Sequence, residues 1–192
     1  LNELSADADE FDSDEKFEEM RRRLQSFTTI SKQKLPTNFI GELRPYQKAG
    51  FDWLNFLREF EVGGILADDM GLGKTVQALA MLQKVYENGN QVLPLRGPVF
   101  GAKLPSLIVV PTSPLFNWQK EIERFTPKLR ALIYSGIDRA KYQKSFGDYD
   151  LIVTSYGIMR RDVELLKKLK FLYVVLDESQ NIKNPVSINA QA

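Results

Sequence analysis

The chain has 192 residues, contains no cysteine and no histidine, and carries a formal net charge of +1 at pH 7. The missing residue types exclude disulfide bonds, thiol nucleophiles, histidine general bases and metal sites built from thiolate or imidazole ligands. Any chemistry must therefore use carboxylates, lysine, hydroxyls, backbone amides or a hard cation. No apolar run approaches the ~18–20 residues of a membrane span, so we expect no membrane partner.

The charge is distributed unevenly. Residues 1–20 hold nine acidic residues and one lysine, a net charge of −8, and the rest of the chain carries +9, which is compatible with a polyanionic partner. Residues 1–13 read as an acidic tail. Apolar residues three and four apart then predict an amphipathic helix over 14–27, which we expect to pack on its own domain rather than to bind a partner. A polar linker follows, so we divide the chain into an extension, 1–36, and a domain, 37–192.

Within the domain, short apolar runs alternate with helical patterns. A first helix starts near Pro45, which suits a first helical turn. The predicted strands are 63–67, 107–111, 131–134, 151–155 and 172–176. The predicted helices between them are 74–86, 114–125 with Ser113 as its N-cap, 139–144 and 157–168, and residues 88–105 read as a long surface loop. The strands are continuous apolar runs, as in a parallel sheet buried on both faces, so the alternation predicts a doubly wound α/β fold.

Residues 65–82, ILADDMGLGKTVQALAML, form the most specific motif of the chain. An apolar run, a glycine-containing loop and a helix pattern follow one another, as in a phosphate-binding loop. Gly71 and Gly73 permit tight turning and a close approach of backbone to phosphate, and the start of the helix attracts the anion. Lys74 can reach the β- and γ-phosphates, and Thr75 can ligate Mg²⁺.

A second motif, LYVVLDESQNIKN, covers residues 172–184. Its apolar strand pattern ends in Asp177 and Glu178, at the end of a strand where α/β sheets bind their ligands. Asp177 can hold Mg²⁺, and Glu178 can polarise an attacking water. An Asp-Glu pair alone also fits the acidic start of a helix. Downstream of a phosphate loop it is the expected Walker B partner, and the two motifs together predict hydrolysis of a nucleoside triphosphate.

Five segments together resemble the Swi/Snf family of ATPases, which translocate on double-stranded DNA and belong to helicase superfamily two. They are LRPYQKAGFDWL, ILADDMGLGKTVQ, LIVVPTSPLFNWQKEIERF, YDLIVTSY and LDESQNIKNP, and they cover the chain from about residue 43 to its end. The superfamily's first motif commonly lacks its first glycine, whose place is taken here by Asp68. Gln180 stands where a histidine often stands, which resembles bacterial and archaeal members more than chromatin-remodelling ones.

The resemblance implies the first RecA-like lobe of such an enzyme: a three-layer α/β P-loop domain with a mainly parallel central sheet, incomplete, plus a short N-terminal helical extension. ATP and Mg²⁺ are the implied cofactors. The implied nucleotide-binding residues are Arg44, Gln47, Asp69, Met70, Gly71, Leu72, Gly73, Lys74 and Thr75, with Gln47 in the adenine-recognising segment. The implied catalytic residues are Lys74, Asp177, Glu178 and Gln180, and the implied Mg²⁺ ligands are Thr75 and Asp177. Gln180 would couple the nucleotide state to the neighbouring lobe.

Two further segments match family motifs that track one DNA strand. Their hydroxyls and helix-start amides suit phosphate oxygens, which position a protein without reading sequence. The candidate DNA contacts are Thr112, Ser113, Asn117, Thr154, Ser155 and Tyr156. Trp118 shares a face with core residues of its predicted helix, so we expect it in the core rather than stacked on a base.

Family members continue, after the Walker B segment, into a Ser/Thr-Gly-Thr-Pro strand and a second RecA-like lobe with arginine fingers, and this sequence contains neither. In the family's sheet order that strand lies between the Walker A and Walker B strands. We therefore expect a fragment with half an ATP site and half a DNA track. Little hydrolysis is expected from it alone, because loss of such arginines can cost ~10³–10⁵ in rate.

The expected partners are ATP, the phosphate backbone of double-stranded DNA, the second lobe and a protein bound to DNA. The expected location is the cytoplasm, at the nucleoid, in a prokaryote, or the nucleus in a eukaryote. Two other functions stay open. A DEAD-box RNA helicase shares both Walker motifs, although the chain lacks Asp-Glu-Ala-Asp. A non-catalytic module with a vestigial nucleotide fold is disfavoured, because Lys74, Thr75, Asp177 and Glu178 are all in place.

Overall fold

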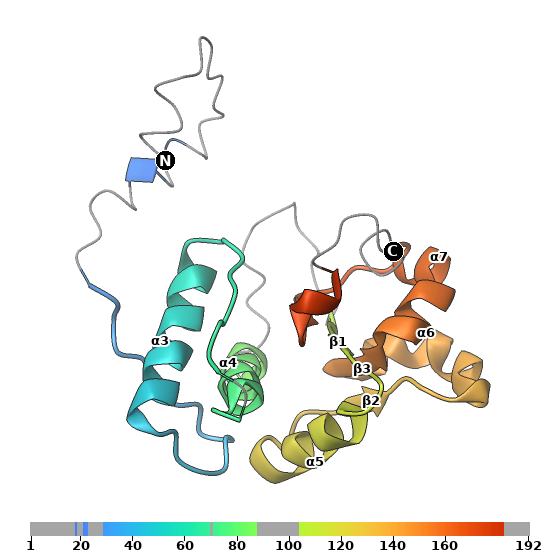
Figure 1. Ribbon diagram of the computed structural model, residues 1–192, viewed down its shortest axis with the longest axis horizontal. Helices are drawn as coiled ribbons and strands as arrows, with labels where there is room; N and C mark the ends of the chain where they lie inside the picture. The colour runs from blue at the N-terminus through green and yellow to red at the C-terminus, as the bar shows by residue number, and fades with distance from the viewer. Residues whose placement is uncertain (1–17, 19–20, 23–28, 70, 88–103, 183–192) are drawn as a thin grey trace.

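The structure is a computed structural model that describes residues 18, 21–22, 29–69, 71–87 and 104–182 (Figure 1). The predicted acidic tail, most of the predicted helix at 14–27 and nearly all of the predicted loop at 88–105 lie outside the described residues. So does Met70 of the phosphate loop.

A parallel sheet lies at the centre of the fold. Its strands run in the order β2-β3-β1-β4, and every pair is parallel. They are β1 (Ser106–Val110), β2 (Ala131–Ile133), β3 (Leu151–Ser155) and β4 (Val174–Leu176). Every residue of β1 and β3 is buried, as their continuous apolar runs predict for central strands.

Helices cover both faces of the sheet, which gives the three layers expected (Figure 1). Ile108 and Val110 of β1 pack with one set of helices, and Leu107 and Val109 point to the other side, because successive strand residues alternate. The first set is α3 (Pro45–Glu59), α4 (Lys74–Glu87) and α5 (Leu115–Phe125). The opposite layer holds the 3₁₀ segment η1 (Ile137–Asp148), α6 (Tyr156–Arg161) and α7 (Val163–Leu166).

The helix predictions are confirmed for α3, α4 and α5, and those at 139–144 and 157–168 need correction. Pro114, not Ser113, is the N-cap of α5, and no side chain caps this helix; the Trp118 N–H bonds the Pro114 carbonyl at 3.0 Å. The helix predicted at 139–144 is 3₁₀, because Phe146 is its one buried residue and no apolar stripe holds an α-helix. The helix predicted at 157–168 is interrupted at Asp162, whose carboxylate binds Arg139 and Tyr134 of the neighbouring segment.

The strand predicted at 63–67 does not form. Residues 62–69 run from α3 towards α4 without pairing to any described strand, and Ile65 is 77% exposed. Among the described strands, β4 pairs only with β1, and Val174 and Leu176 on it are exposed as well. A strand needs a neighbour for its N–H and C=O groups, and the described part of the chain places none between these two segments.

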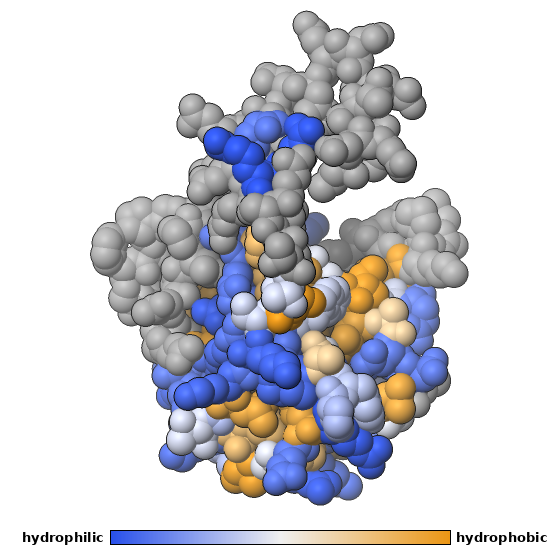
Figure 2. All heavy atoms as spheres, turned by 90° about the vertical axis from the view of Figure 1, so that its left-hand side faces the viewer, coloured by the Kyte–Doolittle hydropathy of each residue, from blue (hydrophilic) through white to orange (hydrophobic). Residues whose placement is uncertain are grey.

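Hydrophobic residues also gather in patches on the side of the molecule that α3 forms (Figure 2). No helix in the described residues has the length and apolar character needed to cross a membrane.

Candidate functional site

The phosphate loop leads directly into α4. Gly71 and Gly73 have φ angles of +81° and +76°, which L side chains rarely adopt. A Cβ on Gly73 would also lie 2.5 Å from Nε2 of Gln47, whereas a Cβ on Gly71 would meet nothing within 4 Å. Gly73 is therefore required for its conformation and for its close approach to Gln47, and Gly71 for its conformation alone.

Lys74, the first residue of α4, folds back over the loop. Its Nζ donates to the carbonyl oxygens of Asp68, at 2.6 Å, and Asp69, at 3.0 Å. The ammonium thus lies beside the N-terminus of α4, where backbone N–H groups and the helix dipole favour an anion. A phosphate bound there would replace two bonds to neutral carbonyls with charge-assisted bonds, which are roughly twice as strong. Thr75 is half-buried in the first turn of the same helix.

Gln47 connects the start of α3 to the phosphate loop. Its Oε1 accepts a hydrogen bond from the Arg44 N–H at 2.9 Å, and its Nε2 donates to the Leu72 carbonyl at 3.0 Å. The Gln47 side chain is buried, whereas Arg44 is exposed. The segment expected to recognise adenine is thereby in direct contact with the loop expected to hold the phosphates.

Gln77 is a part of the site that the sequence analysis missed. It is fully buried, and its Nε2 donates to Oδ2 of Asp68 at 2.9 Å. Asp68, which replaces the first glycine of the motif, is thus tied to the side of α4. Gln77 fits there only because α3 carries Gly50 opposite, where a Cβ would come well within 3.0 Å of the Gln77 amide. The spacing of apolar residues, from which the helix was predicted, does not reveal a buried glutamine, so no pattern in the sequence indicates Gln77.

Asp177 follows β4 and forms hydrogen bonds with residues of three other elements, β1, α5 and α6. Its N–H bonds the Val109 carbonyl of β1 at 2.9 Å, and its Oδ2 accepts the indole N–H of Trp118 at 2.8 Å. Its carbonyl accepts the hydroxyl of Tyr156 at 2.8 Å. Glu178 has a φ of +48° and donates its N–H to Asp177 Oδ1 at 3.0 Å. The carboxylate therefore has a fixed position at the carboxyl end of its strand.

A further carboxylate, Glu121 of α5, lies near Asp177. Burial raises the pKa of Glu121, and the charge of Asp177 raises it further while Arg124 lowers it. Its Oε2 is buried and has no hydrogen-bond partner in the described residues. Burial also raises the pKa of Tyr156, and the charges of Asp177 and Glu178 add to this. Sequence reasoning did not select Glu121, although it stands three residues after Trp118, one turn along the same helix.

The two halves of the predicted nucleotide site remain separate in their contacts. No hydrogen bond or ion pair joins Lys74 to Asp177, and within the described ranges no three acidic side chains converge on one point. The Thr75 hydroxyl and the Asp177 carboxylate offer oxygen donors. Such donors fit Mg²⁺, which takes oxygen ligands and is commonly held by one or two carboxylates together with substrate phosphates. Gln180 is exposed in the 3₁₀ turn η2 (Ser179–Ile182), which follows the pair.

The candidate DNA contacts fall into two groups. Thr112, Ser113 and Asn117 are exposed at and before the start of α5. Thr154, Ser155 and Tyr156 are buried, and each makes a hydrogen bond within the protein: to the Tyr134 carbonyl, from the Ile158 N–H, and to the Asp177 carbonyl, respectively. The side chains of the second group are therefore not available to a phosphate in this conformation. Trp118 is 3% exposed and belongs to the core, as expected.

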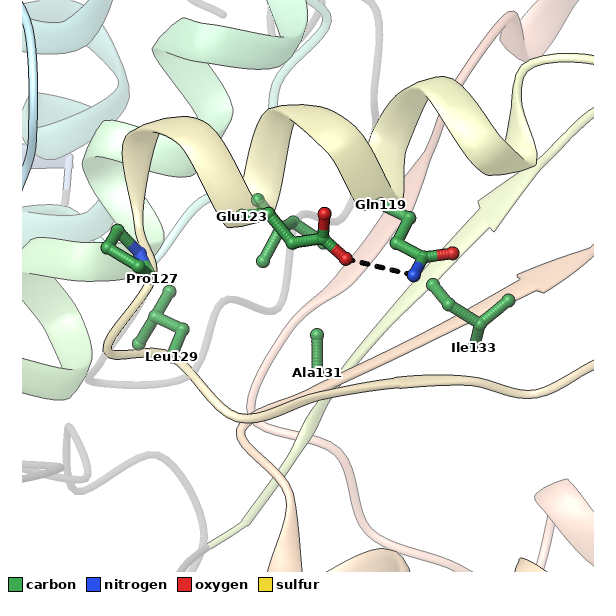
Figure 3. A pocket seen from close by; sticks show the side chains of 7 residues that line it. Gln119, Glu123, Pro127, Leu129, Ala131 and Ile133 are labelled. Atoms are coloured by element: carbon green, nitrogen blue, oxygen red, sulfur yellow. Dashed lines mark hydrogen bonds between the residues drawn. The ribbon is translucent and has the colours of Figure 1, made fainter.

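A pocket of about 280 Å³ lies between α5 and β2, away from both motifs (Figure 3). Gln119 and Glu123 of α5 line it and are hydrogen-bonded to each other at 2.9 Å. Ile122, Pro127, Leu129, Ala131 and Ile133 complete its lining. Within the part of the chain that the structure describes, no predicted nucleotide-binding residue lines this pocket.

The chain is similar to several known proteins. A Bacillus subtilis protein named putative ATP-dependent helicase/translocase YwqA is 40% identical over 178 residues, which are 91% of this chain and 18% of that protein. The Saccharomyces cerevisiae TATA-binding protein-associated factor MOT1 is 38% identical over 161 residues, 83% of this chain and 9% of its own length. The chain thus spans less than a fifth of the length of these relatives.

Solved structures give the same result. The Sulfolobus solfataricus SWI2/SNF2 ATPase core in complex with double-stranded DNA matches with a TM-score of 0.70 and 38% identity, over 83% of this chain and 30% of that one. A second structure, the Sulfolobus solfataricus SWI2/SNF2 ATPase core domain, matches with a TM-score of 0.65 and 36% identity, over 85% of this chain and 31% of that one. The model of the SNF2-related domain matches residues 46–192. The chain therefore has the RecA-like α/β fold of these ATPase cores and belongs to the SNF2-related family.

Proposed function

We propose that this chain is the ATP-binding lobe of an enzyme that couples ATP hydrolysis to movement along double-stranded DNA and thereby remodels protein–DNA complexes. The observation that carries the proposal is the occurrence, in one fold, of a phosphate loop at the start of α4 and of Asp177 and Glu178 directly after a strand of an all-parallel sheet. The similarity to an ATP-dependent helicase/translocase and to an ATPase core solved with double-stranded DNA supports it.

Each residue then has a task in the reaction. Lys74 exchanges its bonds to the loop carbonyls for bonds to the β- and γ-phosphates, and Gln47 holds the loop against α3. Thr75 and Asp177 would hold Mg²⁺, which would neutralise part of the phosphate charge. Glu178 orients the attacking water. A second lobe supplies the arginines that stabilise the transition state, so this chain alone turns over slowly.

The exposed start of α5 provides the DNA-facing part of the lobe. Thr112 and Asn117 present a hydroxyl and an amide to the solvent, and both groups suit phosphate oxygens. Contacts of this kind do not read sequence, which fits an enzyme that moves along DNA.

The first test is a calorimetric titration of Mg–ADP and Mg–ATP into the wild-type protein, Lys74→Ala and Lys141→Ala. Lys141 is exposed on the opposite layer and serves as the matched control. Loss of Lys74 should weaken nucleotide binding by about 10- to 100-fold, because hydrogen bonds to charged groups contribute about 1.5–3 kcal/mol. Equal affinity of the wild type and Lys74→Ala would reject the phosphate-loop assignment.

The second test concerns the nucleic acid. In the intact protein, duplex DNA should stimulate ATP turnover more than single-stranded RNA does, and the effect should weaken as salt rises, because phosphate contacts release counterions. Stimulation by RNA alone would instead favour the RNA-helicase function. Absence of turnover under every condition, with nucleotide binding retained, would favour a non-catalytic module.

A further inference from the structure

Two aromatic side chains hold Asp177 from opposite layers of the sheet. Trp118, from α5, donates its indole N–H to the Asp177 carboxylate, and Tyr156, from the start of α6, donates its hydroxyl to the Asp177 carbonyl; both distances are 2.8 Å. Trp118 is 3% exposed and Tyr156 is 5% exposed. In the sequence they stand 59 and 21 residues from Asp177, so only the fold brings the three together.

Each donor fixes a different degree of freedom of Asp177. The indole N–H binds Oδ2 and selects one orientation of the carboxylate, and Oδ1 is restrained separately by the Glu178 N–H. The Tyr156 hydroxyl binds the backbone at the point where β4 ends and the chain turns, just before Glu178 takes a positive φ. Uncharged donors therefore position both the side chain and the backbone of Asp177.

We propose that Trp118 and Tyr156 are positioning residues that orient Asp177 for a divalent cation; this inference rests on the proposed function. Neither residue would touch the cation or the nucleotide. Carboxylates that ligate metals are themselves hydrogen-bonded, and loss of such outer partners typically costs about 10–100-fold in metal affinity or activity. A purely structural role would instead lower the stability of the fold and leave the Mg²⁺ requirement unchanged.

The chain offers a matched control for each substitution. Trp118→Phe and Tyr156→Phe remove the two donors and keep an aromatic ring. Trp53→Phe changes the other tryptophan of the chain, which lies half-buried on α3. Tyr134→Phe removes the hydroxyl of an equally buried tyrosine that donates to Asp162 rather than to the nucleotide site. The controls therefore report the general cost of losing an indole or a buried hydroxyl.

The experiment measures, in the intact protein, the Mg²⁺ concentration that gives half-maximal strengthening of ADP binding, together with the ADP affinity without Mg²⁺. Trp118→Phe and Tyr156→Phe should each raise this Mg²⁺ concentration about tenfold or more and leave the Mg²⁺-free ADP affinity unchanged. Trp53→Phe and Tyr134→Phe should leave both unchanged. Wild-type Mg²⁺ dependence in both Trp118→Phe and Tyr156→Phe would overturn the inference. Tyr156→Phe loses a single oxygen, so it keeps this test valid if Trp118→Phe does not fold.

A second readout needs neither metal nor nucleotide. The indole N–H proton resonance of Trp118, assigned by its absence in Trp118→Phe, should move when Asp177 is changed to Asn, and the resonance of Trp53 should not. An unmoved Trp118 resonance would overturn the inference even in a protein that binds ADP. Failure of the proposed function looks different: ADP binding is then absent or insensitive to Lys74→Ala, whatever the indole resonance does.

Discussion

The contact between α3 and α4 leads to a prediction that opposes the usual rule for helices. Gly50 lies inside α3, where alanine would ordinarily stabilise a helix by about 1 kcal/mol. Here a Cβ would come well within 3.0 Å of the Gln77 amide, and Gln77 is fully buried and cannot swing into solvent. Gly50→Ala must therefore move Gln77 and break its hydrogen bond to Asp68, or separate the two helices.

The expected loss can be worked out from three terms. Overpacking costs about 1–3 kcal/mol, the lost hydrogen bond about 0.5–1.5 kcal/mol, and the helix gains about 1 kcal/mol from alanine, which leaves a net destabilisation of about 0.5–3.5 kcal/mol. At about 2–4 °C per kcal/mol for a chain of this size, thermal unfolding followed by circular dichroism resolves the change. Because Asp68 belongs to the phosphate loop, nucleotide affinity should fall too.

Gly157→Ala is the control. Gly157 also lies in a helix, α6, but its added Cβ would come no nearer than 4.0 Å to Ser155 Oγ, so this variant should unfold at the wild-type temperature or slightly above it. The double variant Gly50→Ala/Gln77→Ala should be less destabilised than the sum of its parts, because the second change removes the overlapping amide. If Gly50→Ala is as stable as Gly157→Ala, the tight packing of α3 on α4 is refuted.

Two more predictions concern the loop and the opposite layer. Gly73→Ala should weaken Mg–ADP binding far more than Gly71→Ala in a calorimetric titration, because both have positive φ but only Gly73 faces Gln47; equal effects would contradict this reasoning. Asp162→Asn should lower the free energy of unfolding by about 2–3 kcal/mol at pH 7, because Arg139 loses a two-point ion pair that is partly exposed. The Arg139 bond holds the pKa of Asp162 below its usual value, so this stabilisation is present at neutral pH and is lost as the pH falls through the lowered pKa. In urea titrations the two proteins should therefore converge in acid, and a difference that persists there would contradict the assignment.

Sequence patterns predicted the elements that the core determines. The strands β1 and β3 are buried at every position and mostly apolar because helices cover both of their faces, and α5 shows its buried stripe because one side of it faces the sheet. The segment 63–67 has the same apolar pattern and does not form a strand. An apolar run shows that a segment can enter a sheet, but a neighbouring strand is needed to keep it there, and a pattern within one segment carries no information about its neighbours.

The candidate site divides in the same way. Lys74 and Asp177 could be selected because phosphate binding and metal binding require particular residue types at particular places next to a helix start or a strand end. Gln77 and Glu121 could not be selected, because their roles come from contacts between segments that are distant in sequence or lie side by side only after folding. Gly50 carries no local signal either, since its importance depends on what lies opposite.

Asp177 is where these distant contacts meet. The segment from Thr112 to Asn117, exposed at both ends and lying at and before the start of α5, precedes the indole that binds the carboxylate. The buried segment 154–156 ends in the phenol that binds the Asp177 carbonyl. A ligand that moves either segment therefore moves a hydrogen-bond donor of Asp177. Under the proposed function, this arrangement would place the carboxylate expected to hold Mg²⁺ under the control of both segments expected to follow the DNA strand. The effect of Trp118→Phe on the Mg²⁺ requirement thus measures how strongly α5 acts on the nucleotide site.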